Sequence, residues 1–167
     1  MFKNLTVYVA GPLFTIQDRD FLERIRDVVR ACGVNTFLPH EDNNDNAKGR
    51  SSDVSRERLM SIFKGDYTAI KKADGIISVL DGVPVDCGTA WELGFGFALS
   101  KPILGIRTDF RVLGNFDHQR IDLMSEAACT RLLFVPQGDF KLIEEGVQSF
   151  LAELKKQCKT GEAHSRD

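Results

Sequence analysis

The sequence predicts an α/β protein: a flavodoxin-like, doubly wound five-stranded parallel sheet (order 2-1-3-4-5) in a single domain. Three observations predict it. Five short apolar runs rich in β-branched residues recur along the chain, and helical patterns separate them. Such an alternation favours right-handed crossovers between parallel strands. The chain has 167 residues, of which 43% are hydrophobic, and this is enough apolar material for one core.

The N-terminal part predicts a strand, a helix and a second strand. The first strand covers residues 5–10. Thr15 and Asp18 have the spacing of a capping box, so the first helix begins there, and it ends at Gly33. The second strand covers residues 35–38. The face of the helix that is expected to be buried holds Phe21, Ile25, Val28, Val29 and Cys32.

The middle of the chain begins with a polar stretch over residues 40–53, which predicts a loop. This loop is long for a compact domain, and its length favours a functional or mobile segment over a mere connection. A helix is predicted over residues 54–73, with a break allowed at Gly65. The third strand covers residues 75–80. The helix over residues 91–99 is apolar nearly all round, which is typical of a buried helix.

The C-terminal part predicts a fourth strand over residues 102–107 and an irregular stretch over 108–120. A short helix over 121–128 and a fifth strand over 131–135 follow, and the last helix covers 140–158. Its apolar face holds Ile143, Val147, Phe150, Leu151, Leu154 and Cys158. The expected organisation is one domain over residues 1–159 and a disordered polar tail over 160–167.

Charge and composition restrict the class of partner and the compartment. The formal net charge is −2 and no run of Lys or Arg occurs, so neither a nucleic-acid polymer nor a membrane is expected as a partner. No Cys-x-x-Cys pair is present and the three histidines are isolated from the cysteines, so no metal or other cofactor is expected. Reduced thiols and the lack of a signal-peptide pattern predict a cytoplasmic protein. The cysteines are Cys32, Cys87, Cys129 and Cys158, and the histidines are His40, His118 and His164.

The segment from Val85 to Gly94 is the strongest candidate for a functional site. It joins a predicted strand to a predicted helix and carries Asp86 and Glu92. Ligands of open α/β sheets bind beyond the carboxyl ends of the strands, where these two carboxylates are expected. A purely structural alternative exists, because Thr89 and Glu92 also have capping-box spacing and Asp86 suits a turn.

Other known site patterns are missing or ambiguous. No phosphate-binding loop occurs, and Gly94 and Gly96 lie inside a predicted helix rather than at its start, so a nucleotide cofactor is not expected. Cys87 is interpreted as a packing residue because no histidine is placed to activate it. His40 either lines the site or belongs to an ordinary polar loop. Arg107, together with Arg111, pairs with acidic groups or binds substrate.

Tyr8, Phe14 and Asp66 complete the set of candidates. Tyr8 lies in the first strand, and Phe14 follows the Gly-Pro turn at the same edge of the sheet. Both are expected above the crevice that holds the two carboxylates, although Tyr8 also suits a core position with a satisfied hydroxyl. Asp66 lies on the helix before the third strand, where an ordinary surface role is the alternative.

Taken together, these motifs resemble the nucleoside 2-deoxyribosyltransferase family over about residues 5–125. The most specific element is the pattern Asp-x-Gly-Thr-x-x-Glu-x-Gly at residues 86–94. The other matching elements, in the family's order and spacing, are Tyr8-Val9-Ala10-Gly11-Pro12-Leu13-Phe14, Asp66, Ala73-Asp74-Gly75 and Leu80-Asp81-Gly82. The resemblance implies an enzyme that transfers 2-deoxyribose between nucleobases, with a nucleoside and a free nucleobase as substrates.

The resemblance also implies roles for single residues. Glu92 is the nucleophile that forms a glycosyl ester, and the Tyr8 hydroxyl orients it. The carboxyl groups of Asp86 and Asp66 face the base, and one of them, protonated, helps the base to leave. Because Glu92 is expected in the first turn of its helix, the helix dipole should favour its ionised form. The residues expected to bind substrate are Phe14, Gly11, Gly88 and Asp122.

One departure from the family concerns the sugar site. The family commonly carries Asn-Leu-Met in a segment that reaches the site of a neighbouring subunit, which implies a homo-oligomer with shared sites. Here Asp122 replaces the Asn, and an ionised carboxylate accepts but cannot donate a hydrogen bond. It also repels a 5'-phosphate, which favours free nucleosides over monophosphates. An N-glycoside hydrolase and a catalytically inactive nucleoside-binding module remain alternatives to the transferase.

Overall fold

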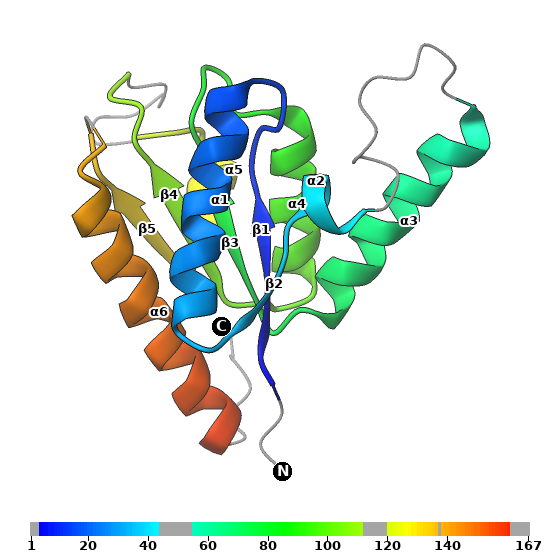
Figure 1. The fold of residues 1–167 in the computed structure, drawn as a ribbon. Coiled ribbons are helices and arrows are strands. Elements are labelled where there is room, and N and C mark those ends of the chain that lie inside the picture. Colours follow the sequence, from blue (N-terminus) through cyan, green and yellow to red (C-terminus); the bar gives the residue numbers. More distant parts are fainter. Residues whose placement is uncertain (1–3, 44–54, 112–119, 137, 161–167) are drawn as a thin grey trace.

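The computed structural model describes residues 4–43, 55–111, 120–136 and 138–160 (Figure 1). Five parallel strands form one sheet in the order β2-β1-β3-β4-β5, which confirms the predicted fold class and strand order. The strands are β1 (Thr6–Ala10), β2 (Asn35–Phe37), β3 (Gly75–Val79), β4 (Ile103–Arg107) and β5 (Arg131–Phe134). The helices are α1 (Ile16–Ala31), α2 (Pro39–Asp42), α3 (Arg56–Lys72), α4 (Cys87–Ala98), α5 (Leu123–Ala128) and α6 (Phe140–Thr160).

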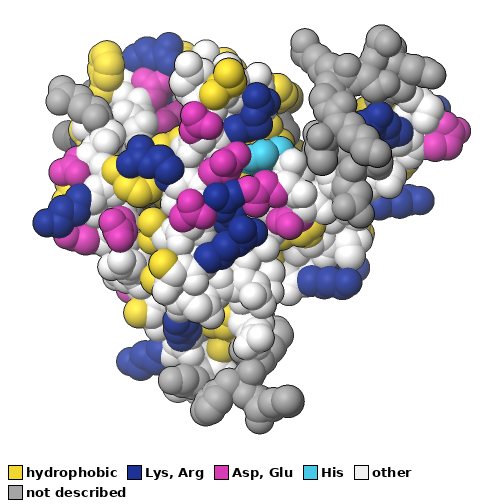
Figure 2. Space-filling model, in the orientation of Figure 1, with side chains coloured by type: hydrophobic (Ala, Val, Ile, Leu, Met, Phe, Trp, Pro, Cys, Tyr) yellow, Lys and Arg dark blue, Asp and Glu magenta, His cyan; other side chains and the backbone are white. Residues whose placement is uncertain are grey.

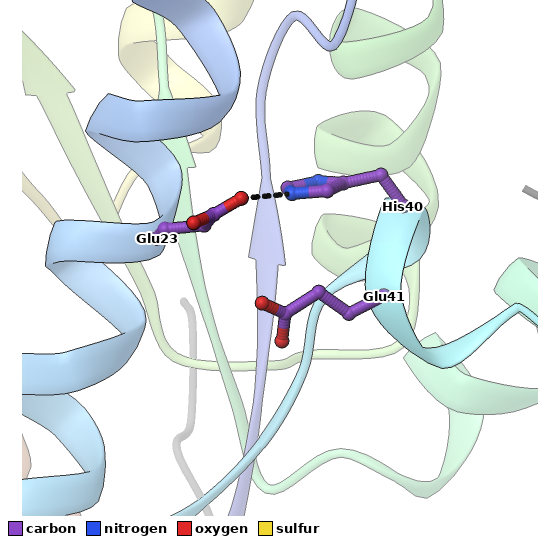
Figure 3. A group of neighbouring side chains, drawn as sticks. All are labelled: Glu23, His40 and Glu41. Carbon is purple, nitrogen blue, oxygen red and sulfur yellow. Dashed lines mark hydrogen bonds and ion pairs between the residues drawn. The ribbon is translucent and has the colours of Figure 1, made fainter. Parts of the chain in front are cut away.

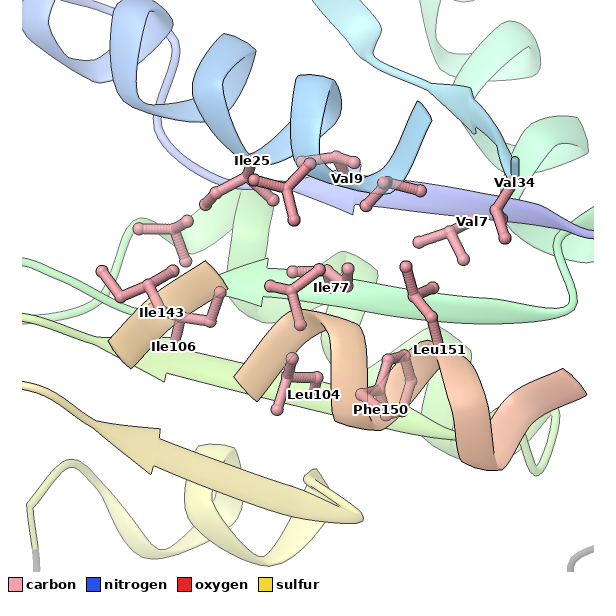
Figure 4. Packing of buried hydrophobic residues seen from close by; sticks show 14 of the residues in the cluster. Val7, Val9, Ile25, Val34, Ile77, Leu104, Ile106, Ile143, Phe150 and Leu151 are labelled. Carbon is pink, nitrogen blue, oxygen red and sulfur yellow. The ribbon is translucent and has the colours of Figure 1, made fainter. Parts of the chain in front are cut away.

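One face of the sheet is covered by α1 and α6, which pack against each other (Figure 1). Their apolar faces meet side chains of β1, β3 and β4 in the larger of two core clusters (Figure 4). The predicted buried faces of both helices are confirmed at most positions, including Ile25 and Ile143, which are fully buried. Leu22 belongs to the α1 face although it was not predicted, and Cys158 of α6 is exposed rather than buried.

The opposite face of the sheet is covered by α3, α4 and α5. Because side chains of a strand alternate between the two faces, Tyr8 and Ala10 of β1 point to this second face, while Val7 and Val9 point to the first. The carboxyl ends of β1 and β3 lie side by side, since Ala10 pairs with Ser78. Tyr8 is therefore placed beneath the helices that carry the candidate carboxylates.

Three details of the predicted elements are wrong. Part of the predicted loop over residues 40–53 is helical, because Pro39 starts the short helix α2. No break occurs at Gly65, which lies inside the continuous helix α3. The helix predicted over residues 91–99 begins earlier, at Cys87, and its aromatic side chains are not all buried. Trp91 is 48% exposed, so one face of α4 is not buried although apolar side chains lie on nearly every face of this helix.

Some predictions lie outside the described residues. These are the loop from residue 44, most of the irregular stretch (112–119), the tail (161–167), and the histidines His118 and His164. Within the ranges that the structure describes, no helix is long and apolar enough to span a membrane.

Candidate active site

The centre of the candidate site is a hydrogen bond between β1 and α4. Tyr8 is fully buried, and its ring stacks on Phe37 of β2 with centroids 5.5 Å apart. Its hydroxyl donates to Oε1 of Glu92 over 2.6 Å. The rigid ring thus holds the hydroxyl directly against the half-buried Glu92 carboxyl group. The structure places these two residues together as their predicted roles require.

Two further carboxyl groups lie close to this pair. Asp66, on α3, interacts with the Tyr8 hydroxyl and raises the pKa of Glu92 through its charge. Asp86 also acts on Glu92 electrostatically. Four of the predicted residues, from three separate elements, therefore converge on one place. Nδ2 of Asn43 donates to Oδ1 of Asp66 over 2.7 Å, a contact that the sequence did not indicate.

The start of α4 differs from the predicted capping box. The N-cap is Asp86, whose carboxylate accepts hydrogen bonds from the backbone N–H (2.8 Å) and the hydroxyl (2.9 Å) of Thr89. Glu92 lies in the second turn, beyond the reach of the free amides at the helix start. The expectation that the helix dipole keeps Glu92 ionised is therefore wrong. Burial dominates instead and raises the pKa of Glu92 to about 8.

Burial affects all three groups at the centre of the site. It raises the pKa of Tyr8 far above its ordinary value, with the charges of Glu92 and Asp66 adding to the effect. It also raises the pKa of Asp66, while the hydrogen bonds from Asn43 and Tyr8 oppose the shift. Two neighbouring carboxyl groups with raised pKa values favour the state in which one is ionised and the other protonated. Burial and the neighbouring charges thus both favour a protonated carboxyl group in this cluster.

An aromatic cluster connects the two helices that carry these acids. Phe63 of α3 contacts Trp91 of α4 with ring centroids 5.6 Å apart, and Tyr67 of α3 stacks on Phe95 of α4 with centroids 5.0 Å apart. Each helix contributes residues four positions apart, which lie on one helix face. That spacing was visible in the sequence and could have indicated the contact. These ring contacts pack α3, which carries Asp66, against α4, which carries Glu92.

The predicted substrate-binding residues are distributed differently. Gly88 lies beside Asp86, whose Oδ2 would be 3.2 Å from a Cβ at that position. Gly11 packs against the core, since its Cβ would be 2.7 Å from a methyl group of Leu22. Phe14 is 73% exposed in the turn before α1. Asp122 is exposed and caps α5 by accepting from the Ser125 N–H over 2.9 Å. No hydrogen bond or ring contact joins Phe14 or Asp122 to the carboxyl cluster within the described part of the chain.

Arg107 holds the loops beside the site rather than facing it. The residue is fully buried, and its guanidinium donates to the carbonyl groups of Leu80, Gly82 (3.2 Å) and Arg111 (2.9 Å). Nη2 also lies 3.9 Å from Oδ2 of Asp109, so Arg107 pairs with an acidic group, which is one of its two predicted alternatives. Asp81 completes this connection by accepting from the backbone N–H of Thr108 over 2.6 Å.

Three residues whose side chains could act as metal ligands lie between α1 and α2. His40 and Glu41 of α2 face Glu23 of α1, and the His40 Nε2 is 3.0 Å from Oε1 of Glu23 (Figure 3). The histidine drawn in cyan in Figure 2 lies among acidic and basic side chains. Arg26 forms an ion pair with Glu41, and Arg30 lies 3.5 Å from it. The guanidinium groups neutralise Glu41, so the arrangement suits an ionic contact between α1 and α2 better than a cation site.

The comparisons with known proteins agree with this geometry. The family model described as nucleoside 2-deoxyribosyltransferase matches residues 7–145. A search of curated proteins found no match. Among solved structures, the 2-deoxyribosyltransferase of Bacillus psychrosaccharolyticus is 24% identical, with a TM-score of 0.66 over 83% of this chain and 90% of its own. The Leishmania mexicana 2-desoxiribosyltransferase is 21% identical, with a TM-score of 0.61 over 86% and 97%.

A further solved structure with the same fold carries a different description. The CMP N-glycosidase of Clostridium botulinum is 19% identical, with a TM-score of 0.55 over 85% of this chain and 97% of its own. At such identities these likenesses establish a common fold and nothing finer. The family model covers most of the chain and includes all four residues of the carboxyl cluster. The chain therefore belongs to the nucleoside 2-deoxyribosyltransferase family.

Proposed function

We propose that this protein transfers 2-deoxyribose from a 2'-deoxynucleoside to a second nucleobase through a covalent glycosyl ester on Glu92. The observation that supports this most strongly is the 2.6 Å hydrogen bond from Tyr8 to Glu92, with Asp66 and Asp86 beside it. Cleavage of an N-glycosidic bond needs a carboxylate to receive the anomeric carbon and an acid to protonate the base. The cluster supplies both.

In the first half of the reaction, an oxygen of the Glu92 carboxylate forms a bond to the anomeric carbon. The bond between that carbon and the base nitrogen breaks, and its electron pair goes to the base. Asp66 or Asp86, in its protonated form, donates a proton to the departing base. The Tyr8 hydroxyl stabilises the Glu92 carboxylate before attack and so keeps the nucleophile oriented.

In the second half, a nitrogen of the incoming base attacks the anomeric carbon. The ester bond breaks, and its electron pair returns to Glu92 as a carboxylate. The proton that the acceptor loses goes to the acidic residue that donated one earlier, so the enzyme is restored. No cofactor enters this scheme.

A hydrolase is the second candidate, because water can replace the incoming base on the same ester. The likeness to a protein described as a CMP N-glycosidase supports this alternative. The exposed carboxylate of Asp122 favours free nucleosides over monophosphates in either case, since it repels a phosphate. We further infer a homo-oligomer, in which the segment with Asp122 contributes to a neighbouring site. Leu123 and Met124, which follow it, are 56% and 78% exposed.

A substrate panel tests the proposal. Deoxynucleosides, ribonucleosides and their monophosphates are each incubated with and without adenine or cytosine, and the released and exchanged bases are quantified. Exchange that depends on the acceptor base supports the transferase, and equal release of base without acceptor supports the hydrolase. Binding of nucleosides without turnover would contradict both enzymatic activities and would support a nucleoside-binding module.

A variant pair tests the nucleophile in the same assay. Glu92→Ala should abolish exchange, whereas Glu145→Ala, an exposed change on α6 at the other face of the sheet, should retain it. Full exchange activity in Glu92→Ala would contradict the covalent mechanism. Mass spectrometry of rapidly quenched wild-type protein should detect the deoxyribosyl group on the peptide that contains Glu92.

A further inference from the structure

We propose that Asn43 is a positioning residue whose amide holds the Asp66 carboxyl group toward Tyr8 and Glu92, and that Gly65 leaves the space this amide needs. The inference rests on the proposed function for the importance of Asp66. Its geometry stands independently, since it depends only on contacts between α2 and α3.

The contact itself is short and enclosed. Asn43 directly follows α2 and is only 8% exposed. Its Nδ2 donates to Oδ1 of Asp66 over 2.7 Å. Gly65 precedes Asp66 on α3, and a Cβ there would be 2.2 Å from Oδ1 of Asn43. Any side chain at position 65 would therefore displace the amide from Asp66.

The position of Asn43 is set by elements other than α3. The short helix α2 is connected to α1 by the contact between His40 and Glu23 (Figure 3). An ion pair between Arg26 and Glu41 connects the same two helices. The amide thus approaches Asp66 from a separately anchored support. A hydrogen bond from such a support restricts the rotamers of the Asp66 side chain. The backbone of α3 by itself does not impose this restriction.

The amide also opposes the rise that burial causes in the pKa of Asp66. The groups that face Asp66 are the Tyr8 hydroxyl from β1, the Glu92 carboxyl from α4 and the Asn43 amide. The donated hydrogen bond favours the Asp66 carboxylate and opposes the effect of burial on its pKa. Loss of the amide should raise the pKa of Asp66 further, so that its protonated form persists to higher pH.

Two variants remove the contact in different ways. Asn43→Ala deletes the amide, and Gly65→Ala leaves it intact but displaces it. Each should lower kcat/KM for base exchange by about tenfold or more, because an Asp66 carboxyl group that the amide no longer holds is misplaced relative to the reacting base. Because alanine is the stronger helix former, Gly65→Ala should lose activity without unfolding. The control is Thr68→Ala, an exposed change on the same helix that also favours the helix and should retain full activity.

The double variant decides whether Gly65 acts through Asn43. If it does, Gly65→Ala should have almost no further effect on kcat/KM in the Asn43→Ala background. Independent losses that multiply would contradict the shared role. An unchanged kcat/KM in Asn43→Ala would overturn the positioning role directly.

A measurement without substrate separates this inference from the proposed function. The titration of the Asp66 side chain is followed by carbon NMR in wild-type protein and in Asn43→Ala. We expect the midpoint to rise in the variant. A raised midpoint in a protein that exchanges no base would retain the role of Asn43 and reject the proposed function. An unchanged midpoint would reject the role of Asn43 whatever the activity.

Discussion

Replacement of Tyr8 by phenylalanine tests the central contact of the site with the smallest change. The variant removes one hydroxyl group, while the ring and its stacking on Phe37 remain. Wild-type Tyr8 donates to Glu92 over 2.6 Å, and this hydrogen bond lowers the pKa of Glu92 against the effect of burial. Without the donor, the ionised carboxylate is less stable. Tyr8→Phe should therefore raise the pKa of Glu92 above its value of about 8.

The size of the effect follows from the strength of the lost contact. A hydrogen bond to a charged group contributes about 1.5–3 kcal/mol, which corresponds to a pKa change of about one to two units. In wild-type protein at pH 7, a pKa of about 8 leaves about one tenth of Glu92 ionised. In the variant that fraction falls by a factor of about 10 to 100. If the carboxylate is the nucleophile, kcat/KM at pH 7 falls by the same factor.

The assay is the pH dependence of kcat/KM for base exchange. The acid limb of the profile should move to higher pH in Tyr8→Phe, and part of the lost activity should return as the pH rises. The matched control is Tyr67→Phe, because Tyr67 is the other tyrosine of the chain and lies in the aromatic cluster. It should leave the position of the acid limb unchanged. A uniform loss of activity in Tyr8→Phe, with an unmoved limb, would refute the role of the hydroxyl in the ionisation of Glu92.

Three further variants test the electrostatics and the packing. In wild-type protein the raised pKa of Glu92 contributes stability that is complete below about pH 4.5 and is lost as the pH rises through about 8. Above pH 8, the free energy of unfolding of Glu92→Gln should therefore exceed that of wild-type protein by about 2–4 kcal/mol. Thermal denaturation should show that this difference disappears toward pH 4. Gly96→Ala places a Cβ 2.1 Å from Ile76 Cδ1, so it should destabilise the fold by about 1–3 kcal/mol in urea denaturation. Asp81→Ala leaves the Thr108 N–H without its acceptor and should lower stability by about 1–3 kcal/mol in the same experiment, and an unchanged midpoint would contradict that role.

The fold could be predicted because its signals are local and repeated. The strands β1, β3 and β4 are buried on both faces of the sheet. Their sequences are therefore continuous apolar runs rich in β-branched residues, which predict buried parallel strands. The alternation of strands with helices then leaves few arrangements of the sheet. The contact between Tyr8 and Glu92 was implied by the resemblance to the family, in which the hydroxyl of this tyrosine orients the glutamate, and the structure joins the two by a hydrogen bond.

Other features could not be predicted because they depend on tertiary contacts with no sequence period. Asn43 lies in a stretch of Asn and Asp residues, and its contact with Asp66 depends on the approach of α2 to α3, which has no signal in the sequence. The exposure of Trp91 was missed for a related reason. An apolar side chain on every face of α4 indicates a preference for burial, but the number of neighbouring elements decides how many faces are covered.

Burial, and not the dipole of α4, controls the pKa of Glu92. A carboxylate stabilised by a helix dipole would have an ordinary or low pKa and would serve as a base alone. Here Asp86 occupies the cap, and Glu92 lies one turn further on, where burial controls its pKa. The Tyr8 hydrogen bond opposes that effect and favours the Glu92 carboxylate, whereas burial and the charges of Asp66 and Asp86 favour its protonated form. Burial therefore brings the protonated and ionised forms of Glu92 close in free energy near neutral pH, so that the hydrogen bond from Tyr8 can shift the balance between them, as the proposed mechanism needs.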